Sequence, residues 1–509
     1  MADPAGARAF GVADTVVTPN TPAFLTEPMI DRTGFREYDA RWRYPEQINL
    51  IGVQALGLAL ATQLFEMGGA RPRVVVGCDY RAHALAVKQA LTLGLTLGGA
   101  EALDIGVCVT PMAYFAREHL DAPAVAMVTA SHNPDGWTGV KMGARPPLTH
   151  GPAEMARLKT ITLEGRGVAR HGGAWRPVGG VRAAWLDDLA GDFRLSRPLK
   201  VVCACGNGAA GLVAPALLRR IGATVVERHC TPDYAFPHYN PNPESPLMLR
   251  DMGAAAREAG ADLALGFDGD GDRCGVTDGE GRAIFADVVG VLLARALLRD
   301  HPGATFVVDV KSTGLYRTDP ALAGARIDMW KTGHSHMKAR VAELGALAGF
   351  EKSGHFFFAP PIGRGYDCGL RAALEICRLL DRAPGRSLAD LRAALPPVWA
   401  TPMLAPACPD TEKYGVIARL TARLQAMAAA GAPLAGRRIL SVLTVNGARA
   451  VLEGGGWILL RASSNTPNLV LAAESPHSAA DLSALVAALN ILTATEPGVA
   501  APGSAPEAV

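Results

Sequence analysis

Short β-branched runs alternate along this chain with Ala- and Leu-rich stretches of helical length. Each run meets Gly, Asn, Asp or Ser where it ends. The clearest runs span 73–79, 124–133, 199–208, 261–272 and 305–314. Repeated strand–turn–helix units of this kind predict parallel sheets covered on both faces by helices. Because ligands of such sheets bind beyond the carboxyl ends of the strands, the polar turns there are the candidate binding and catalytic sites.

The pattern changes after about residue 396, where strands are separated by Gly and Asn turns and followed by one last helix, at 477–492. This predicts a small α+β domain with an antiparallel sheet. Both chain ends are rich in Ala and Pro without a sustained period, so we expect loose tails there. The expected division is a tail at 1–30, three α/β domains at 31–178, 179–281 and 282–395, an α+β domain at 396–497 and a tail at 498–509.

Composition excludes several classes of protein. Among 509 residues, 50 Lys and Arg face 48 Asp and Glu, so the chain has no net basic field for a nucleic acid. The longest uncharged run, Gln47–Phe65, contains Gln, Asn and Thr, which favours a core helix over a membrane span. The N-terminus carries Asp3 and lacks an apolar core, so we expect no secretory signal.

Nine cysteines are scattered along the chain. Only Cys203 and Cys205 lie close together, and we expect them on opposite faces of one strand. Unpaired spacing of this kind is typical of a reducing cytoplasm with buried free thiols. Together with the composition, it predicts a soluble, cytoplasmic, multidomain protein without a nucleic-acid or membrane partner.

An acidic loop follows the apolar strand at 261–267. Asp268, Asp270 and Asp272 alternate there with glycines. Three carboxylates so close repel one another unless a cation lies among them, and hard oxygen ligands select Mg²⁺ or Ca²⁺. An EF-hand would need Gly and Glu where Arg273 and Gly279 stand. The loop therefore predicts a Mg²⁺ site with open positions for water and a phosphate oxygen; the alternative is a solvated acidic turn.

A second polar turn, 129–134, reads Thr-Ala-Ser-His-Asn-Pro and is followed by Lys141. A serine at a sharp turn that ends a strand can present its hydroxyl to a site. Alone, Ser-His-Asn is equally typical of ordinary turns and caps. Beside a Mg²⁺ loop, Ser131 becomes a candidate phosphoryl acceptor, since the metal can neutralise a transferring phosphoryl group.

Two further loops carry recognition chemistry. Residues 349–355 place Glu351, Ser353 and His355 between two glycines, and a carboxylate beside a hydroxyl can bind vicinal sugar hydroxyls. His355 is equally consistent with a core or capping histidine. The His-x-His pair within 331–336 lacks a third ligand nearby, which makes zinc improbable.

The segment 461–468, Arg-Ala-Ser-Ser-Asn-Thr-Pro-Asn, follows a strand in the last domain. One guanidinium among hydroxyls, amides and backbone N–H groups can cradle a phosphate. The alternative is a plain polar turn.

A competing motif must be weighed. Gly206, Gly208 and Gly211 form G-x-G-x-x-G after a strand, and Glu227 ends the next strand, where a ribose-binding acid belongs. That pattern is typical of dinucleotide-binding oxidoreductases. Such a function leaves the four polar loops unexplained, and glycines also serve close helix–strand packing. A Walker-type nucleotide site is excluded, because the chain contains no Gly-Lys dipeptide.

Taken together, the segments TASHNP, DGDGDR, FEKSGH and RASSNTPN resemble, in order and spacing, the α-D-phosphohexomutase superfamily. The opening segment FREYDARWR is similar to the family's first motif, and WKTGHS favours the bacterial phosphomannomutase/phosphoglucomutase branch. The resemblance implies an α/β fold of four domains around a central cleft. Three would be mixed α/β domains rather than purely parallel ones, and the fourth an α+β domain like the TATA-box-binding protein.

The resemblance also implies roles for individual residues. Ser131 would carry the phosphoryl group, and its phosphate oxygen would complete a Mg²⁺ site formed by Asp268, Asp270 and Asp272. The candidates for proton transfer are Arg41, Lys141 and His355. The implied substrate-binding residues are Tyr38, Arg273, Lys311, His334, Glu351, Ser353, Arg461, Ser463, Ser464 and Asn465.

The implied activity is the interconversion of mannose, and of glucose, 6- and 1-phosphates through a phosphoserine and a 1,6-bisphosphate. The implied cofactors are Mg²⁺ and catalytic glucose (or mannose) 1,6-bisphosphate. The implied partners are small-molecule hexose phosphates, and the chain would be a monomer or dimer. Phosphoglucosamine mutase and a non-catalytic sugar-phosphate-binding protein remain alternatives. The phosphate loop carries an extra residue relative to the Arg-x-Ser-Asn-Thr of many relatives, which shifts Ser464 and Asn465 by one position. Ala40 and Trp42 stand where relatives commonly carry Ile and Gly.

Overall fold

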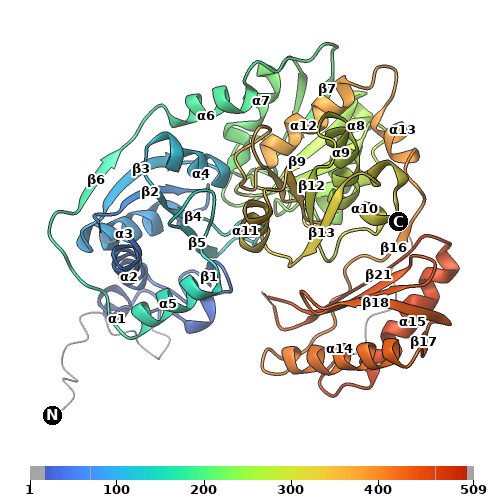
Figure 1. Cartoon of the computed structure of the whole chain (residues 1–509). Helices are drawn as coiled ribbons and strands as arrows, with labels where there is room; N and C mark the ends of the chain where they lie inside the picture. Colours follow the sequence, from blue (N-terminus) through green and yellow to red (C-terminus); the bar gives the residue numbers. More distant parts are fainter. Residues whose placement is uncertain (1–17, 69, 465, 501–509) are drawn as a thin grey trace. The chain divides into compact units, whose positions relative to one another are not determined.

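The computed structural model describes residues 18–68, 70–464 and 466–500 (Figure 1). The chain divides into two compact units. The first contains Met1–Ala286 and Ser353–Leu388, and the second contains Asp287–Lys352 and Ala389–Val509. Each unit is described by itself below.

The first unit begins with a six-stranded mixed sheet in the order β1-β5-β4-β2-β3-β6. Its strands are β1 (Ala40–Arg43), β2 (Arg73–Cys78), β3 (Glu101–Val107), β4 (Ala124–Val128), β5 (Trp137–Gly143) and β6 (Ala174–Pro177). Strands β2, β3, β4 and β6 are parallel, whereas β5 and β1 run antiparallel to their neighbours. Every residue of β4 is buried, as expected for a strand covered on both faces.

Two short elements precede this sheet, α1 (Pro22–Thr26) and η1 (Arg32–Gly34). The longer helices of this part are α2 (Leu50–Gly68), α3 (Ala84–Leu97), α4 (Thr110–His119) and α5 (Pro152–Leu163). Among the described residues, α2 alone is long and apolar enough to span a membrane, but 67% of its apolar window is buried inside the protein. Its Val53, Leu56 and Leu60 belong to the core of this domain, so α2 is a core helix.

A second mixed sheet in the same unit has the order β11-β10-β9-β7-β8. Its strands are β7 (Lys200–Ala204), β8 (Thr224–Arg228), β9 (Leu263–Phe267), β10 (Cys274–Asp278) and β11 (Ala283–Ile284). The other elements of this part are α6 (Val181–Ala190), η2 (Ala209–Leu212), α7 (Ala214–Arg220), α8 (Pro246–Ala259), β15 (Phe356–Phe358) and α12 (Gly369–Asp381). Strand β7 is parallel to β8 and β9, whereas β10 returns antiparallel to β9.

These antiparallel strands correct the expectation of purely parallel sheets and confirm mixed ones. The acidic loop is the short turn of the β9–β10 hairpin, and the serine loop joins the antiparallel strands β4 and β5. A strand that is buried on both faces has the same apolar pattern whether its neighbour runs parallel or antiparallel. Periodicity therefore could not distinguish parallel from antiparallel pairing.

The second unit contains three parallel strands in the order β13-β12-β14. They are β12 (Thr305–Asp309), β13 (Arg326–Trp330) and β14 (Ala348–Phe350). The helices of this region are α9 (Ala286–Asp300), α10 (Leu315–Thr318), η3 (Pro320–Leu322), α11 (His334–Leu344) and α13 (Leu388–Ala393).

The same unit ends in a six-stranded antiparallel sheet, as the sequence predicts, in the order β16-β21-β20-β19-β18-β17. Its elements are β16 (Trp399–Ala400), α14 (Lys413–Ala429), β17 (Pro433–Leu434), β18 (Arg437–Leu443), β19 (Ala448–Leu452), β20 (Trp457–Ala462), β21 (Leu469–Ser475) and α15 (Ala479–Ala494). Helices α14 and α15 share the apolar core on one face (Figure 1), while Trp457 and Leu459 on the other face pack with Val310. Ser478 caps α15 by accepting from Asp481 N, so the helix begins at Ala479, two residues beyond the predicted start at 477.

One expectation about the cysteines is wrong. Cys203 and Cys205 do not point to opposite faces, because side chains two residues apart in a strand share a face. Their Sγ atoms lie 3.8 Å apart. All nine cysteines are free and buried, as expected.

Candidate active site

Ser131 lies in the turn between β4 and β5 with a φ of +52°, in the left-handed region that side chains other than glycine rarely adopt. Residues held there store about 1–3 kcal/mol of strain, and such residues cluster at functional sites. Its backbone N–H donates to Thr129 Oγ1 at 2.8 Å, and that hydroxyl donates to Asp79 Oδ2 at 2.8 Å. The turn is therefore held in shape from the carboxyl end of β2.

A buried guanidinium clamps the same turn. Arg81 donates through Nη2 to Ser131 O and Asn133 O, both at 2.8 Å, and through Nη1 to Pro134 O at 2.9 Å. Its Nε faces Asp79 Oδ2 at 3.1 Å. Sequence reasoning missed this residue, although Asp79 and Arg81 directly follow an apolar strand and offered the same signal as the other polar turns.

The three aspartates lie together in the turn of the β9–β10 hairpin. Asp268, Asp270 and Asp272 are fully buried, and one carboxylate oxygen of each lies within 4.8 Å of the others. Ser131 Oγ donates to Asp268 Oδ2 at 3.0 Å. A Cβ at Gly269 would stand 2.6 Å from Ser131 O, so only glycine lets the acidic loop pack directly on the serine loop.

Lys141, on β5, contributes a positive charge to this acidic group. Its Nζ donates to Asp270 Oδ2 at 2.7 Å and also to Asp272. Burial by itself would lower the pKa of Lys141, but attraction to these two carboxylates raises it well above its ordinary value. Burial, with repulsion by the other two carboxylates, raises the pKa of Asp268 well above the usual range. Burial opposes the charge of Asp272 too, yet Lys141 and His355 hold its pKa well below the ordinary value.

The donor set fits a magnesium ion. Asp270 Oδ2 accepts from Thr110 Oγ1 at 2.5 Å and from Lys141, whereas its Oδ1 is buried and accepts no hydrogen bond from any residue that the structure describes. A buried carboxylate oxygen left without a donor is costly unless a cation binds it. Three carboxylates with no nitrogen or sulfur ligand among them are the hard donors that Mg²⁺ prefers. Thr110, which orients Asp270, gave no recognisable signal in the sequence.

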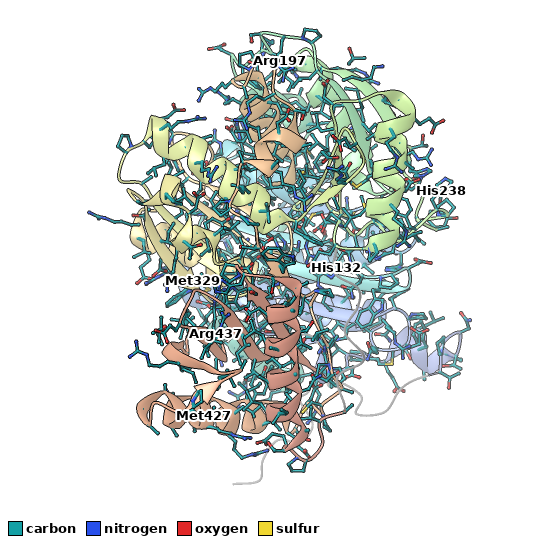
Figure 2. All side chains as sticks on the ribbon, turned by 90° about the vertical axis from the view of Figure 1, so that its right-hand side faces the viewer. His132, Arg197, His238, Met329, Met427 and Arg437 are labelled. Carbon is teal, nitrogen blue, oxygen red and sulfur yellow. The ribbon has the colours of Figure 1, made fainter. Side chains whose placement is uncertain are left out.

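Two histidines lie near the serine and acidic loops. His132, labelled in Figure 2, places Nδ1 3.3 Å from Ser131 Oγ, and burial lowers its pKa well below the ordinary value, so its ring is neutral. His355 places Nε2 3.3 Å from Asp272 Oδ1, while its Nδ1 lies 3.3 Å from Ser353 Oγ. The structure thus brings His355 and Ser353 to the acidic loop, and it places His132 beside Ser131.

Arg273 follows the acidic loop directly and is tied to it. Its backbone N–H donates to Asp268 Oδ1 at 3.2 Å, and its Nε lies 3.4 Å from His355 Nε2. Its Nη1 donates to Glu244 at 3.1 Å. Arg273 therefore links the acidic loop to His355.

Arg41, on β1, approaches the serine loop from its other side. Its Nη1 donates to Thr129 O at 2.8 Å, and its Nε and Nη2 pair with Asp39 at 3.1 and 2.7 Å. Burial lowers the pKa of Arg41, but attraction to Asp39 outweighs it and leaves the pKa raised, so the guanidinium stays charged. Tyr38 is buried in the segment before β1.

The remaining predicted residues belong to the second unit. Lys311 follows β12 and places Nζ 3.6 Å from Asp309 Oδ2. His334 is the first residue of α11, and Glu351, directly after β14, accepts from Gly333 N at 2.5 Å. Glu351 thus also fixes the turn that leads into His334.

The predicted phosphate cradle begins where β20 ends. Arg461 Nη2 donates to Ser464 Oγ at 3.2 Å, while Arg461 Nε is buried and donates to no acceptor among the described residues. Ser463 Oγ lies 2.7 Å from Thr466 Oγ1 and accepts from Thr466 N at 3.2 Å. Asn465 lies outside the described residues. The loop offers one orphaned guanidinium donor beside two hydroxyls, which suits an anion.

The ammonium group of Lys413 holds the backbone of this loop. Lys413, the first residue of α14, donates to Ser463 O at 2.5 Å and to Thr466 O at 3.0 Å. Sequence reasoning missed Lys413, because nothing in its local sequence indicates a long-range contact.

The glycine-rich motif that competes for a dinucleotide is used for packing. A Cβ at Gly208 would stand 2.9 Å from Gly269 Cα, and a Cβ at Gly211 would stand 1.8 Å from Cys230 O. The N–H of Ala209 donates to Gly269 O at 3.0 Å. Gly208 therefore lets the acidic loop pack closely, and Gly211 lets the segment after β8 pack closely.

Comparisons with known proteins show which family the chain resembles. Four domain models of phosphoglucomutase/phosphomannomutase match in order: α/β/α domain I at 32–166, domain II at 183–281, domain III at 286–398 and the C-terminal domain at 407–491. The chain is 34% identical over 464 residues to a phosphomannomutase/phosphoglucomutase of Pseudomonas putida, covering 90% of this chain and 95% of that one. It is 32% identical over 452 residues to a phosphoglucomutase of Neisseria gonorrhoeae, covering 89% and 95%.

A crystal structure of a phosphoglucomutase/phosphomannomutase family protein from Burkholderia thailandensis superposes with a TM-score of 0.83 at 30% sequence identity. The match covers 93% of this chain and all of that one. Fold and domain order thus agree across nearly the whole chain.

Proposed function

Because the chain belongs to the phosphoglucomutase/phosphomannomutase family of α-D-phosphohexomutases, we propose that it interconverts mannose 6-phosphate and mannose 1-phosphate, and the corresponding glucose phosphates. It is thus an isomerase that moves a phosphoryl group within a hexose phosphate. One observation carries the proposal: a strained, buried serine hydroxyl donates to an aspartate of a buried acidic trio across two packed loops.

In the proposed cycle, Ser131 starts as a phosphoserine. The free hydroxyl of a hexose monophosphate attacks its phosphorus, the bond from phosphorus to Ser131 Oγ breaks, and a hexose 1,6-bisphosphate forms. After the bisphosphate turns over, Ser131 Oγ attacks the other phosphate and releases the isomeric monophosphate. Catalytic glucose (or mannose) 1,6-bisphosphate supplies the first phosphoryl group to an unphosphorylated Ser131.

The three aspartates would bind the Mg²⁺ ion. Mg²⁺ held by Asp268, Asp270 and Asp272 would neutralise the charge of the phosphoryl group on Ser131. Lys141, charged between two of these carboxylates, adds a second fixed positive charge beside the same loop.

Protons must move at Ser131 Oγ as the phosphoryl group leaves and returns. Asp268 Oδ2 at 3.0 Å and His132 Nδ1 at 3.3 Å are the acceptors within reach of this oxygen. We assign proton exchange with the substrate hydroxyl to His355, which is held between Asp272 and Ser353. Lys141 and Arg41, the other two candidates, stay charged and would instead stabilise the transferring phosphoryl group.

The other predicted residues are assigned to the substrate. Arg461, Ser463 and Ser464 would hold the phosphate that is not transferred, and one cradle serves both orientations because the two phosphates of the bisphosphate look alike to it. The sugar and its phosphates would be bound by Glu351, Ser353, Lys311, His334, Arg273, Tyr38 and Asn465. We also propose a cytoplasmic location and a monomeric or dimeric state.

Turnover assays test this proposal. The purified chain is given mannose 1-phosphate, glucose 1-phosphate or glucosamine 1-phosphate with Mg²⁺ and a trace of glucose 1,6-bisphosphate. Ser131→Ala is the blank, and Ser483→Ala, on the exposed side of α15, is the matched control. We expect turnover of the first two sugars, loss in the blank, and a single phosphoryl group on the peptide containing Ser131.

Activity on glucosamine phosphate alone would keep the mechanism and change the substrate. Undiminished turnover in Ser131→Ala would overturn the mechanism. No turnover of any sugar, with intact binding of hexose phosphates, would indicate a binding protein.

A further inference from the structure

Three cysteine thiols meet at the carboxyl ends of two neighbouring parallel strands. Cys203 lies on β7, Cys205 follows it, and Cys230 lies just beyond β8. The Sγ atom of Cys205 is 3.8 Å from that of Cys203 and 3.5 Å from that of Cys230, and all three lie within 4.8 Å of one another. We call these residues the thiol cluster.

The thiol cluster is closed to bulk water except at one corner. Cys203 and Cys205 are 0% exposed and Cys230 is 6% exposed, so an ion could enter only past Cys230. Cys230 also packs on the end of β7, because its Sγ donates to the backbone oxygen of Cys203 at 3.1 Å. Thiolates, rather than thiols, are metal ligands.

The spacing of the sulfurs matches that of ligands around one ion. Three thiolates at about 2.3 Å from a metal in one plane stand about 4 Å apart, and about 3.8 Å apart if the geometry is tetrahedral. The two short Sγ–Sγ distances of the cluster, 3.5 and 3.8 Å, are close to these values. A disulfide, in contrast, needs about 2.05 Å between sulfurs, so no pair in the cluster is at bonding distance.

The ligand count selects the metal. Among the described residues, no fourth His, Cys, Asp or Glu joins the three cysteines. Structural zinc sites almost always use four ligands in a tetrahedron, whereas soft thiolates also select Cu(I), which three sulfurs can satisfy. We therefore propose that Cys203, Cys205 and Cys230 form a binding site for a soft, monovalent metal ion, Cu(I), separate from the acidic trio.

The position of the thiol cluster gives binding a structural consequence. The loop after Cys205 is held by Asn207 N, which donates to His229 O at 2.7 Å, and by Ala209 N, which donates to Gly269 O. An ion that ties Cys205 to Cys230 would join the start of this loop to the segment that follows β8. Because the ion binds only the folded arrangement, it should raise the melting temperature of the chain.

The test uses the reduced, full-length chain without oxygen. Cu(I) is supplied from a chelator of known affinity, and the bound metal is counted after removal of excess. We expect one Cu(I) per chain, X-ray absorption showing three sulfur neighbours at about 2.3 Å, and a melting temperature raised by several degrees. Cys230→Ser should reduce the affinity at least tenfold, whereas Cys408→Ala, which removes a buried thiol in the other unit, should not.

Several outcomes would overturn the site. They are no binding against the chelator, binding unchanged in Cys230→Ser, or nitrogen and oxygen neighbours in place of sulfur. Tighter binding of Zn²⁺ with a fourth ligand would contradict the three-coordinate assignment. Because Cys230→Ser could unfold, the sulfur count on the unmodified chain is decisive by itself. A disulfide between Cys205 and Cys230 in the isolated chain, found by peptide mapping together with no bound copper, would replace the metal site by a redox pair.

Discussion

The hydroxyl of Ser131 donates to the carboxylate of Asp268 at 3.0 Å, although 137 residues separate them. Two strand-ending turns from different sheets of the first unit create this contact, and Gly269 makes it possible by leaving room for Ser131 O. The phosphoryl acceptor and the metal loop that we assign are thus one packed structure.

Two substitutions of Ser131 distinguish the role of its hydroxyl in turnover from the effect of its strained backbone on stability. Ser131→Ala and Ser131→Gly should each lower turnover by roughly 10³-fold or more, because no hydroxyl remains to carry the phosphoryl group. The left-handed φ of +52° suits glycine better than alanine, so the Gly variant should be more stable by about 1 kcal/mol. Turnover assays and urea unfolding measure the two effects. Equal stability of the variants would contradict the strain.

Gly269→Ala should damage the reaction without removing any reactive group. The new methyl would stand 2.6 Å from Ser131 O, a backbone atom, so the two loops must separate. A displacement of about 1 Å can reduce turnover by roughly 10²-fold. Gly179→Ala is the matched control, since nothing lies within 4 Å of a Cβ there. Wild-type kcat in Gly269→Ala would show that the contact is not needed.

Removing the metal should stop turnover reversibly. EDTA should abolish activity, and added Mg²⁺ should restore it, because the trio holds the cation that neutralises the phosphoryl group. Asp270→Asn removes the charge of the carboxylate that holds the unpartnered buried oxygen, and should raise the Mg²⁺ concentration for half-maximal turnover at least tenfold. Asp262→Asn, at the surface before β9, serves as control. Full activity in EDTA would rule out the metal site.

Arg81 is a positioning residue for the serine loop. Arg81→Lys replaces three carbonyl contacts with a single ammonium, so the free energy of unfolding should fall by about 2–3 kcal/mol. The rate at which glucose 1,6-bisphosphate phosphorylates Ser131 should fall about tenfold, while KM changes little. Arg157→Lys, in an exposed ion pair with Glu66, controls for the loss of a guanidinium. A loss of stability with an unchanged phosphorylation rate would leave Arg81 a purely structural role.

Arg461→Ala should weaken substrate binding equally for mannose and glucose phosphates. Its guanidinium, with a buried Nε that finds no acceptor in the part of the chain that the structure describes, is assigned to the phosphate and not to the sugar. Loss of one charge-assisted contact corresponds to about 1.5–3 kcal/mol, or a rise in KM of roughly tenfold or more. Arg438→Ala, an exposed arginine on β18, is the control. A change in the ratio of the two sugars would contradict the assignment.

The sequence alone indicated most of the chemistry. Asp268, Asp270 and Asp272 are neighbours in the chain, so their convergence needs only a tight turn. Polar residues at strand ends pointed to Ser131, Glu351 and Arg461, because strand alternation and turn residues are local signals. The same locality predicted three α/β domains followed by an antiparallel α+β domain, which the fold and the family comparison confirm.

Tertiary structure decided what local sequence could not express. The direction of β5 and β10, the clamp of Arg81 on the serine loop and the support of Lys413 under the phosphate loop depend on contacts between distant segments. The motif at Gly206, Gly208 and Gly211 was ambiguous until the acidic loop was found packed on it. Periodicity records which side of an element is buried, but not which other segment buries it, and that partner is selected only when the whole chain packs.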